Sequence, residues 1–153
     1  MRKRLISSVP SSPTDVWLPV EELASVEITS EDSAMPVEAA LHGDAPGWRA
    51  AEPGPQTIRV VFDRPQTLRR IRLVFVELDL ERTQEVTLRW SPDGGRSFHD
   101  VVRQQWNFSP TGATREVEDY SVELAGVSML ELEVVPNIAG GPARASLAEL
   151  RLA

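Results

Sequence analysis

The chain has 153 residues, which is enough for one domain with a substantial core and too few for two domains of ordinary size. Its 16 Lys and Arg residues against 23 Asp and Glu residues give a formal charge of −7 at pH 7, so the whole molecule has no attraction to nucleic-acid phosphates or anionic lipids. No cysteine is present, which excludes disulfide frameworks and thiolate metal sites. The 12 proline and 9 glycine residues favour an all-β chain with frequent reversals.

Residues 1–24 are predicted to form a flexible lead and a docking arm. The first part combines basic residues with Ser and Pro and offers little to bury. No apolar stretch of a signal peptide follows the basic residues at positions 2–4, and no segment approaches the about 18 consecutive apolar residues of a membrane-spanning helix. We therefore expect a cytoplasmic location and no membrane contact. Pro19 interrupts any helix over residues 15–24, which predicts a short extended arm or a single turn anchored by Trp17.

From Ser25 onward, short runs alternate apolar and polar residues and end in turn residues, which is typical of half-buried antiparallel strands. Eight such runs are expected, with no substantial helix between them. Their inward-facing residues are Val26 and Ile28; Ile58, Val60 and Phe62; Ile71, Leu73 and Phe75; Val86, Leu88 and Trp90; Val102, Gln104 and Trp106; Tyr120, Val122 and Leu124; Leu130, Leu132 and Val134; and Ala148, Leu150 and Leu152.

These runs predict an all-β fold, an antiparallel β-sandwich of the jelly-roll type over residues 25–153. Turn residues separate the runs, and we find no internal repeat. The expected turns are Asp63-Arg64-Pro65, Ser91 to Gly95, Ser109 to Gly112, and Pro136 to Pro142.

The order of these elements resembles the discoidin, or coagulation-factor type C, family, a galactose-binding-domain-like jelly roll that many carbohydrate-binding modules also use. The segment ALHGDAPGW, residues 40–48, is similar to the family's Ala-Leu-Asp-Gly-Asp loop and following Trp. The segment VTLRWSPDGGRSF, residues 86–98, resembles its Val-x-x-Ser-x-Asp-Gly-x-x-Trp hairpin, with Phe98 at the aromatic position. This hairpin also fits one box of a sialidase-like propeller, but a single box cannot build repeating blades. The resemblance implies a non-catalytic binding module, and it favours carbohydrate binding through loops at one end of the sandwich.

Many modules of this family hold a structural calcium ion through the backbone carbonyls of that loop and a late glutamate. Here His42 stands at the first Asp of the loop, and Gly47 replaces a Ser or Thr ligand. Asp44 and Glu149 are left as the candidate metal contributors. We expect no cofactor, with structural calcium at these two residues as the open alternative.

No catalytic motif is recognisable in the sequence. The two histidines, His42 and His99, lie in different predicted loops, which argues against a His-based zinc cluster or a Ser-His-Asp relay. A nucleophile elbow, a phosphate-binding loop and a His-Glu-x-x-His motif are also missing. We therefore expect no enzymatic activity.

Polar and aromatic residues gather in the predicted loops, where a rigid sandwich presents its binding groups. In the carbohydrate-binding modules that this chain resembles, an aromatic ring stacks on the sugar while Arg and Asn side chains bind its hydroxyls. The expected ligand-binding residues are Arg49, Arg82, Trp106 and Asn107. The alternative for Trp48 and Trp106 is that they seal the core.

Two other kinds of partner remain open. The chain could be a protein-docking subunit of a larger assembly, since jelly rolls of this kind occur in such assemblies. It could also be a nucleic-acid-binding scaffold, because four arginines project from what we expect to be neighbouring strands: Arg69, Arg70, Arg72 and Arg89. The interleaved acidic residues at 77–85 count against nucleic acid, since they predict a mixed, salt-bridged face. The sequence does not indicate an oligomeric state.

Overall fold

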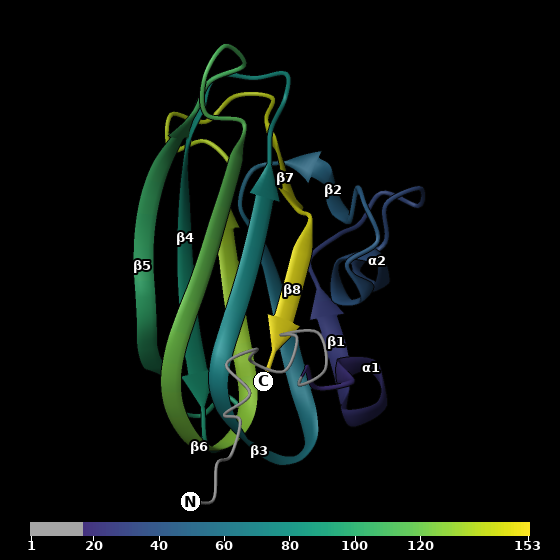
Figure 1. Cartoon of the computed structure of the whole chain (residues 1–153), viewed down its shortest axis with the longest axis vertical. Coiled ribbons are helices and arrows are strands. Elements are labelled where there is room, and N and C mark those ends of the chain that lie inside the picture. Colours follow the sequence, from purple (N-terminus) through teal and green to yellow (C-terminus); the bar gives the residue numbers. More distant parts are fainter. Residues whose placement is uncertain (1–16) are drawn as a thin grey trace, which may run out of the picture.

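The computed structural model describes residues 17–153, so most of the predicted flexible lead lies outside the described residues. The chain folds as an antiparallel β-sandwich, which confirms the predicted fold class (Figure 1). No helix of the described part is long and apolar enough to span a bilayer. The elements are α1 Val20–Leu23, β1 Ala24–Ile28, α2 Val37–His42, β2 Trp48–Pro53, β3 Gln56–Val76, β4 Arg82–Ser91, β5 His99–Phe108, β6 Arg115–Val135, β7 Arg144–Leu147 and β8 Glu149–Leu152.

Two long strands, β3 and β6, pass through both layers of the sandwich. In one layer their paired halves lie between β1 and β4, with β5 at the edge, and in the other the same two strands continue beside β8. Figure 1 shows both strands turning at the lower end of the molecule and running back upward. Four of the eight predicted runs are therefore the halves of two bent strands.

The predicted turn at Asp63-Arg64-Pro65 is wrong, because these residues lie inside β3. The pairing of β3 with β6 shifts register between Val61 and Gln66, so proline occupies an irregularity in the strand. Proline has no N–H to donate to a ladder and is tolerated at such irregularities. Residues 63–65 do change the direction of the chain, but they do so as the bend of β3 between the two layers and not as a turn between strands.

Most inward-facing residues are those that the alternation predicted; Ala148, which lines a surface pocket, and the buried Glu131 are exceptions. Members of every predicted run lie in the core or pack against it. The helix α2 and the small two-stranded ladder of β2 with β7 were not predicted. The predicted loop at residues 40–44 begins instead as the last turn of α2.

The hairpin that carries the family resemblance is held by side-chain hydrogen bonds around Asp93. Its carboxylate accepts from the Ser97 hydroxyl at 2.6 Å, from the Ser97 amide at 2.8 Å and from the Ser91 hydroxyl at 2.8 Å. These bonds, those from Ser97 foremost, lower the pKa of Asp93 to about 2. Such bonds stabilise the charged carboxylate, so the role of this motif is structural.

The segment before α1 lies against the last strand and the second half of β3. The Leu18 amide donates to the Leu152 carbonyl at 2.7 Å. The Arg70 guanidinium lies 4.7 Å from the centre of the Trp17 ring, and α1 is a single turn after Pro19. Residues 17–19 thus form a short arm docked on the sandwich, and Trp17 is one of its contact residues.

One side of the sandwich interior is polar. Glu116, Glu118 and Tyr120 lie on the inward side of β6, and the Tyr120 hydroxyl donates to the Gln104 side-chain oxygen in β5. Burial raises the pKa of Glu118 to about 7, and a hydrogen bond and negative charge from Glu116 add to the shift. Near neutral pH the folded protein therefore holds a proton that the unfolded chain releases.

This proton makes stability depend on pH. Because the folded protein binds it more tightly, stability falls as pH rises from 4.5 to about 7 and stays lower above that range. We expect Glu118→Gln to raise the thermal midpoint at about pH 8 and to leave it nearly unchanged below about pH 4.5. Thermal unfolding followed by circular dichroism across this pH range measures the difference in thermal midpoint between Glu118→Gln and wild type.

The matched control is Glu123→Gln, which changes an exposed glutamate in the same half of β6. It should leave the wild-type pH dependence intact. A Glu118→Gln curve that runs parallel to wild type at every pH would contradict the assignment.

Candidate functional site

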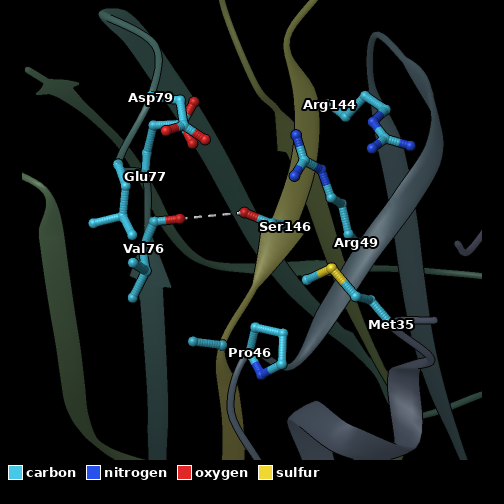
Figure 2. Close-up of a pocket in the computed structure, with 10 residues that line it drawn as sticks. Met35, Pro46, Arg49, Val76, Glu77, Asp79, Arg144 and Ser146 are labelled. Carbon is cyan, nitrogen blue, oxygen red and sulfur yellow. Dashed lines mark hydrogen bonds between the residues drawn. The ribbon is translucent and has the colours of Figure 1, made fainter. Parts of the chain in front are cut away.

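A pocket lies where the small β2·β7 ladder meets the connection from β3 to β4. It has a volume of about 140 Å³. Figure 2 shows Glu77 and Asp79 on one side, Arg49 and Arg144 on the other, and Ser146 between them. Apolar contact comes from the remaining lining residues, which are Met35, Pro46, Val76, Leu78 and Ala148.

The pocket wall is built by long-range pairing. Arg49 of β2 lies opposite Ser146 of β7, and the Arg49 amide donates to the Met35 carbonyl at 3.1 Å. The neighbouring Trp48 is fully buried and donates through its indole N–H to the Ser30 carbonyl at 3.0 Å. Trp48 thus belongs to the core, which was one of the two roles considered for it. By fixing β2, it makes Arg49 face the pocket.

Gly47 permits the close approach of β2 to the end of β7. Its φ of +88° is in the left-handed region, and a Cβ built there would lie 2.3 Å from the Leu147 carbonyl oxygen. A side chain at this position would push the two backbones apart. Glycine is therefore required for the geometry that places Arg49 beside Ser146.

Arg82 is buried and does not line the pocket. It is only 4% exposed, and its guanidinium contacts Glu77 at 3.2 Å, the Pro136 carbonyl at 2.5 Å and the Gln84 side-chain oxygen at 2.7 Å. Burial lowers the pKa of Arg82, the carboxylate of Glu77 opposes this, and the charge of Arg49 lowers it further. Arg82 was predicted to bind a ligand. It instead holds Glu77, a carboxylate that lines the pocket.

The side chains available to a ligand include both hydrogen-bond donors and hydrogen-bond acceptors. The Arg49 Nε is buried and has no hydrogen-bond partner in the described part of the chain. Arg144 lies 3.5 Å from Asp32, and the Ser146 hydroxyl makes only a 3.5 Å contact with the Val76 carbonyl. Asp79 is exposed. The pocket therefore presents donors on one wall and acceptors on the other.

Trp106 was predicted both as an inward-facing strand residue and as a ligand-binding residue, and Asn107 as a ligand-binding loop residue; both lie in β5. Trp106 faces inward, with its ring 5.2 Å from that of Phe75, and Asn107 faces outward and accepts from the Thr83 hydroxyl at 2.5 Å. Neither residue lines the pocket. Of the four predicted ligand-binding residues, the structure places Arg49 alone in its wall.

The lining residues Arg144 and Ser146 were missed, because no local pattern reveals that β7 pairs with β2. Glu77 and Asp79 were counted among the interleaved acidic residues at 77–85, but neither was predicted to bind a ligand. For Arg82 a signal was present: it shares the inward face of β4 with Gln84, Val86 and Leu88. Extending the alternation backward would have predicted its burial.

The residues proposed for calcium do not fit a metal site. Asp44 is 74% exposed and lies 3.7 Å from His42, whereas Glu149 contacts Arg72 and Arg151. No cluster of three His, Cys, Asp or Glu side chains that could hold a metal occurs among residues 17–153. The His42 carbonyl, in the loop that was considered for calcium from the sequence, accepts from the Arg151 guanidinium at 2.5 Å.

The expected salt-bridged arginine face is confirmed in part. Arg70 and Arg72 contact Asp119 across β3 and β6, at 2.6 and 3.6 Å. Arg89 lies in the other layer, where it and Arg59 both contact Glu131. Arg89 was expected on a strand next to that of Arg70 and Arg72, and this is wrong. Its strand, β4, pairs with the second half of β6, whereas Arg70 and Arg72 lie in the second half of β3, in the other layer.

Comparison with solved structures assigns the fold. A family 32 carbohydrate-binding module from C. perfringens NanJ, solved in complex with galactose, matches with a TM-score of 0.65 and 16% identity over 89% of this chain and 96% of that one. The chain has the galactose-binding-domain-like, discoidin-like fold. Neither a protein-family model nor a curated protein matches the sequence.

Two further structures with this discoidin-like fold differ in what they bind. The family 32 module of AlyQ, in complex with 4,5-unsaturated mannuronic acid, matches with a TM-score of 0.63 and 16% identity over 86% of this chain and 95% of that one. Reduced XRCC1, bound to the catalytic domain of DNA polymerase β, matches with a TM-score of 0.62 at the same identity and coverage. The fold therefore serves both sugar binding and protein binding.

The buried Arg82–Glu77 pair can be tested by substitution. Arg82→Ala leaves Glu77 and the Pro136 carbonyl without their donor, which should cost about 3 kcal/mol of unfolding free energy. Urea unfolding measures the loss. The control is Arg103→Ala, which removes the exposed partner of Glu85 from β5 and should change stability little. Equal effects of the two substitutions would contradict the structural role of Arg82.

Proposed function

We propose that this protein is a non-catalytic binding module that recognises a carbohydrate in the pocket between β2, β7 and residues 77–79. The observation that carries the proposal is the pairing of a guanidinium wall with a carboxylate wall at one end of a rigid sandwich. Sugar hydroxyls both donate and accept hydrogen bonds, so one ring can join Arg49 on one wall and Asp79 on the other. The likeness to modules solved with galactose and with an unsaturated mannuronic acid supports this proposal.

The two histidines, which could serve as a general base in acyl transfer, lie away from the pocket. His42 contacts Glu21 at 2.8 Å, and the His99 ring lies 4.9 Å from that of Trp90. Neither histidine lines the pocket. The arrangement supports binding without catalysis.

The pocket offers aliphatic contact in place of an aromatic platform. Leu78, which is 63% exposed, lines the pocket together with Met35 and Pro46. Aliphatic side chains bury less area than a ring and lack its π-face. We therefore expect weak binding of a single sugar ring, with a Kd of about 1 mM.

A protein partner is the second candidate, and a specific observation favours it. Leu78 and Leu80 project from the β3–β4 connection, and Ile138, whose amide donates to the Thr83 carbonyl, is 50% exposed close to that connection. Exposed apolar residues gathered at one end of a domain are typical of protein contacts. The XRCC1 structure is an example of this fold bound to a protein.

The carbohydrate proposal is tested by titrating the labelled protein with galactose, N-acetylgalactosamine and galacturonate while following amide resonances by NMR. Shifts should concentrate at residues 46–49, 77–79 and 144–148. Arg49→Gln should weaken binding about tenfold or more, since it removes a charged donor. Arg103→Gln, an exposed arginine of β5 outside the pocket, is the control. No shifts at sugar concentrations of about 50 mM would reject carbohydrate binding.

The protein-docking candidate predicts that the tagged chain elutes from a native extract in a complex larger than itself. The double variant Leu78→Ser and Ile138→Ser should then elute alone, because the apolar contact is lost. Val117→Ser, which alters an exposed apolar residue of β6, serves as the control. A wild-type chain that elutes alone would count against this candidate.

A further inference from the structure

The segment between α2 and β2 begins at a carbonyl group that the helix cannot satisfy. His42 is the last residue of α2, and Gly43 follows as its left-handed cap, with φ of +71°. The last carbonyls of a helix have no amide partner within it and need another donor. Here the donor is the Arg151 guanidinium, whose Nη2 lies 2.5 Å from the His42 oxygen.

Gly43 admits the guanidinium as well as ending the helix. A Cβ at this position would lie 2.7 Å from the Arg151 Nη2. A side chain here would require the guanidinium end of Arg151 to shift. The glycine and the arginine, 108 positions apart in the chain, are thus matched to each other.

The rest of the Arg151 side chain is held by the last strand. Its Nε lies 3.5 Å from the Glu149 carboxylate, which also faces Arg72 at 3.7 Å. Arg151 therefore links a carboxylate of β8 to a carbonyl at the end of α2. A bound cation that bridges two segments would make the same two kinds of contact, to a carboxylate and to a backbone carbonyl.

The segment that this link holds forms part of the candidate pocket. Pro46 and Arg49 both line the pocket, and Gly47 packs its backbone against Leu147 and Ala148. The pairing of β2 with β7 holds the far end of the segment, and Arg151 holds the near end. Residues 43–47 are consequently fixed from both sides.

We infer that Arg151 is a positioning residue, an internal cation that fixes residues 43–47 without a metal ion and thereby orients Pro46 and Arg49 in the pocket. Its effect on ligand binding rests on the proposed function. Its effect on the order of residues 43–47 does not. Calcium should therefore be dispensable for the order of this segment.

The first test is amide hydrogen exchange on the intact chain. Arg151→Met removes the cation and keeps most of the bulk, and it should speed exchange at residues 43–48 about tenfold while leaving β4 and β5 unchanged. Arg151→Lys should restore part of the protection, because it keeps the charge but not the forked donor. Arg103→Met, the same change at an exposed arginine, should not alter exchange in this segment. Unchanged exchange in Arg151→Met would overturn the inference, and if that variant does not fold, Arg151→Lys decides in its place.

The second test adds calcium or a chelator to the wild-type chain. Neither should change the exchange at residues 43–48 or the thermal midpoint, and protection that grows with calcium would overturn the inference.

Galactose titration of the folded variants separates positioning from stability. Arg151→Met should bind several-fold more weakly than wild type, with partial rescue by Arg151→Lys. Equal affinity would reject the positioning role while leaving the proposed function intact. Faster exchange in Arg151→Met, together with no binding of galactose, N-acetylgalactosamine or galacturonate by wild type, would instead reject the proposed function and retain the link.

Discussion

The structure depends on the antiparallel pairing of β3 with β6. This ladder runs from Gln56 opposite Val134 to Val76 opposite Arg115, and both strands bend at the same level. Because the two strands bend together, each contributes a half to both layers, and β1, β4 and β8 pair with those halves. The sandwich is therefore one continuous ladder folded over, and the two layers are joined covalently through both of its strands.

The buried ion pair of Arg82 and Glu77 links this core to the candidate pocket. Arg82 contacts the Phe108 ring, Gln84 and the Pro136 carbonyl on the core side, and Glu77 on the pocket side. A buried cation needs such partners, since removing a charge from water is costly. The carboxylate wall of the pocket is consequently positioned by the interior of the sandwich and not by the loop alone.

The sequence predicted most of the sandwich because alternation is a local signal. In β4 and β6, a two-residue period is enough to separate Leu88 and Leu132, which are buried, from Thr87 and Glu133, which face outward. The pairing of Trp48 with Leu147 and of Arg49 with Ser146 has no such signal, because it joins segments about a hundred residues apart. The pocket was therefore not predicted, although one of its arginines was.

Two errors in the interpretation have physical causes of their own. Pro65 is a turn signal by composition, yet it lies in a strand because an irregular register tolerates the missing N–H. Arg82 and Trp106 were assigned to a binding surface by residue type, while their positions in the alternation placed them on the inward face. Where residue type and periodicity disagreed, periodicity was the better guide.

The arm before α1 covers part of the free side of β8, the last strand. β8 pairs with β3 along one side only, and the Leu18 amide occupies the Leu152 carbonyl on the other side, with Trp17 held against Arg70. An open strand edge can recruit a strand from another molecule. The arm occupies one carbonyl on this side of β8, and a chain without it would leave the Leu152 carbonyl open to a strand from another molecule.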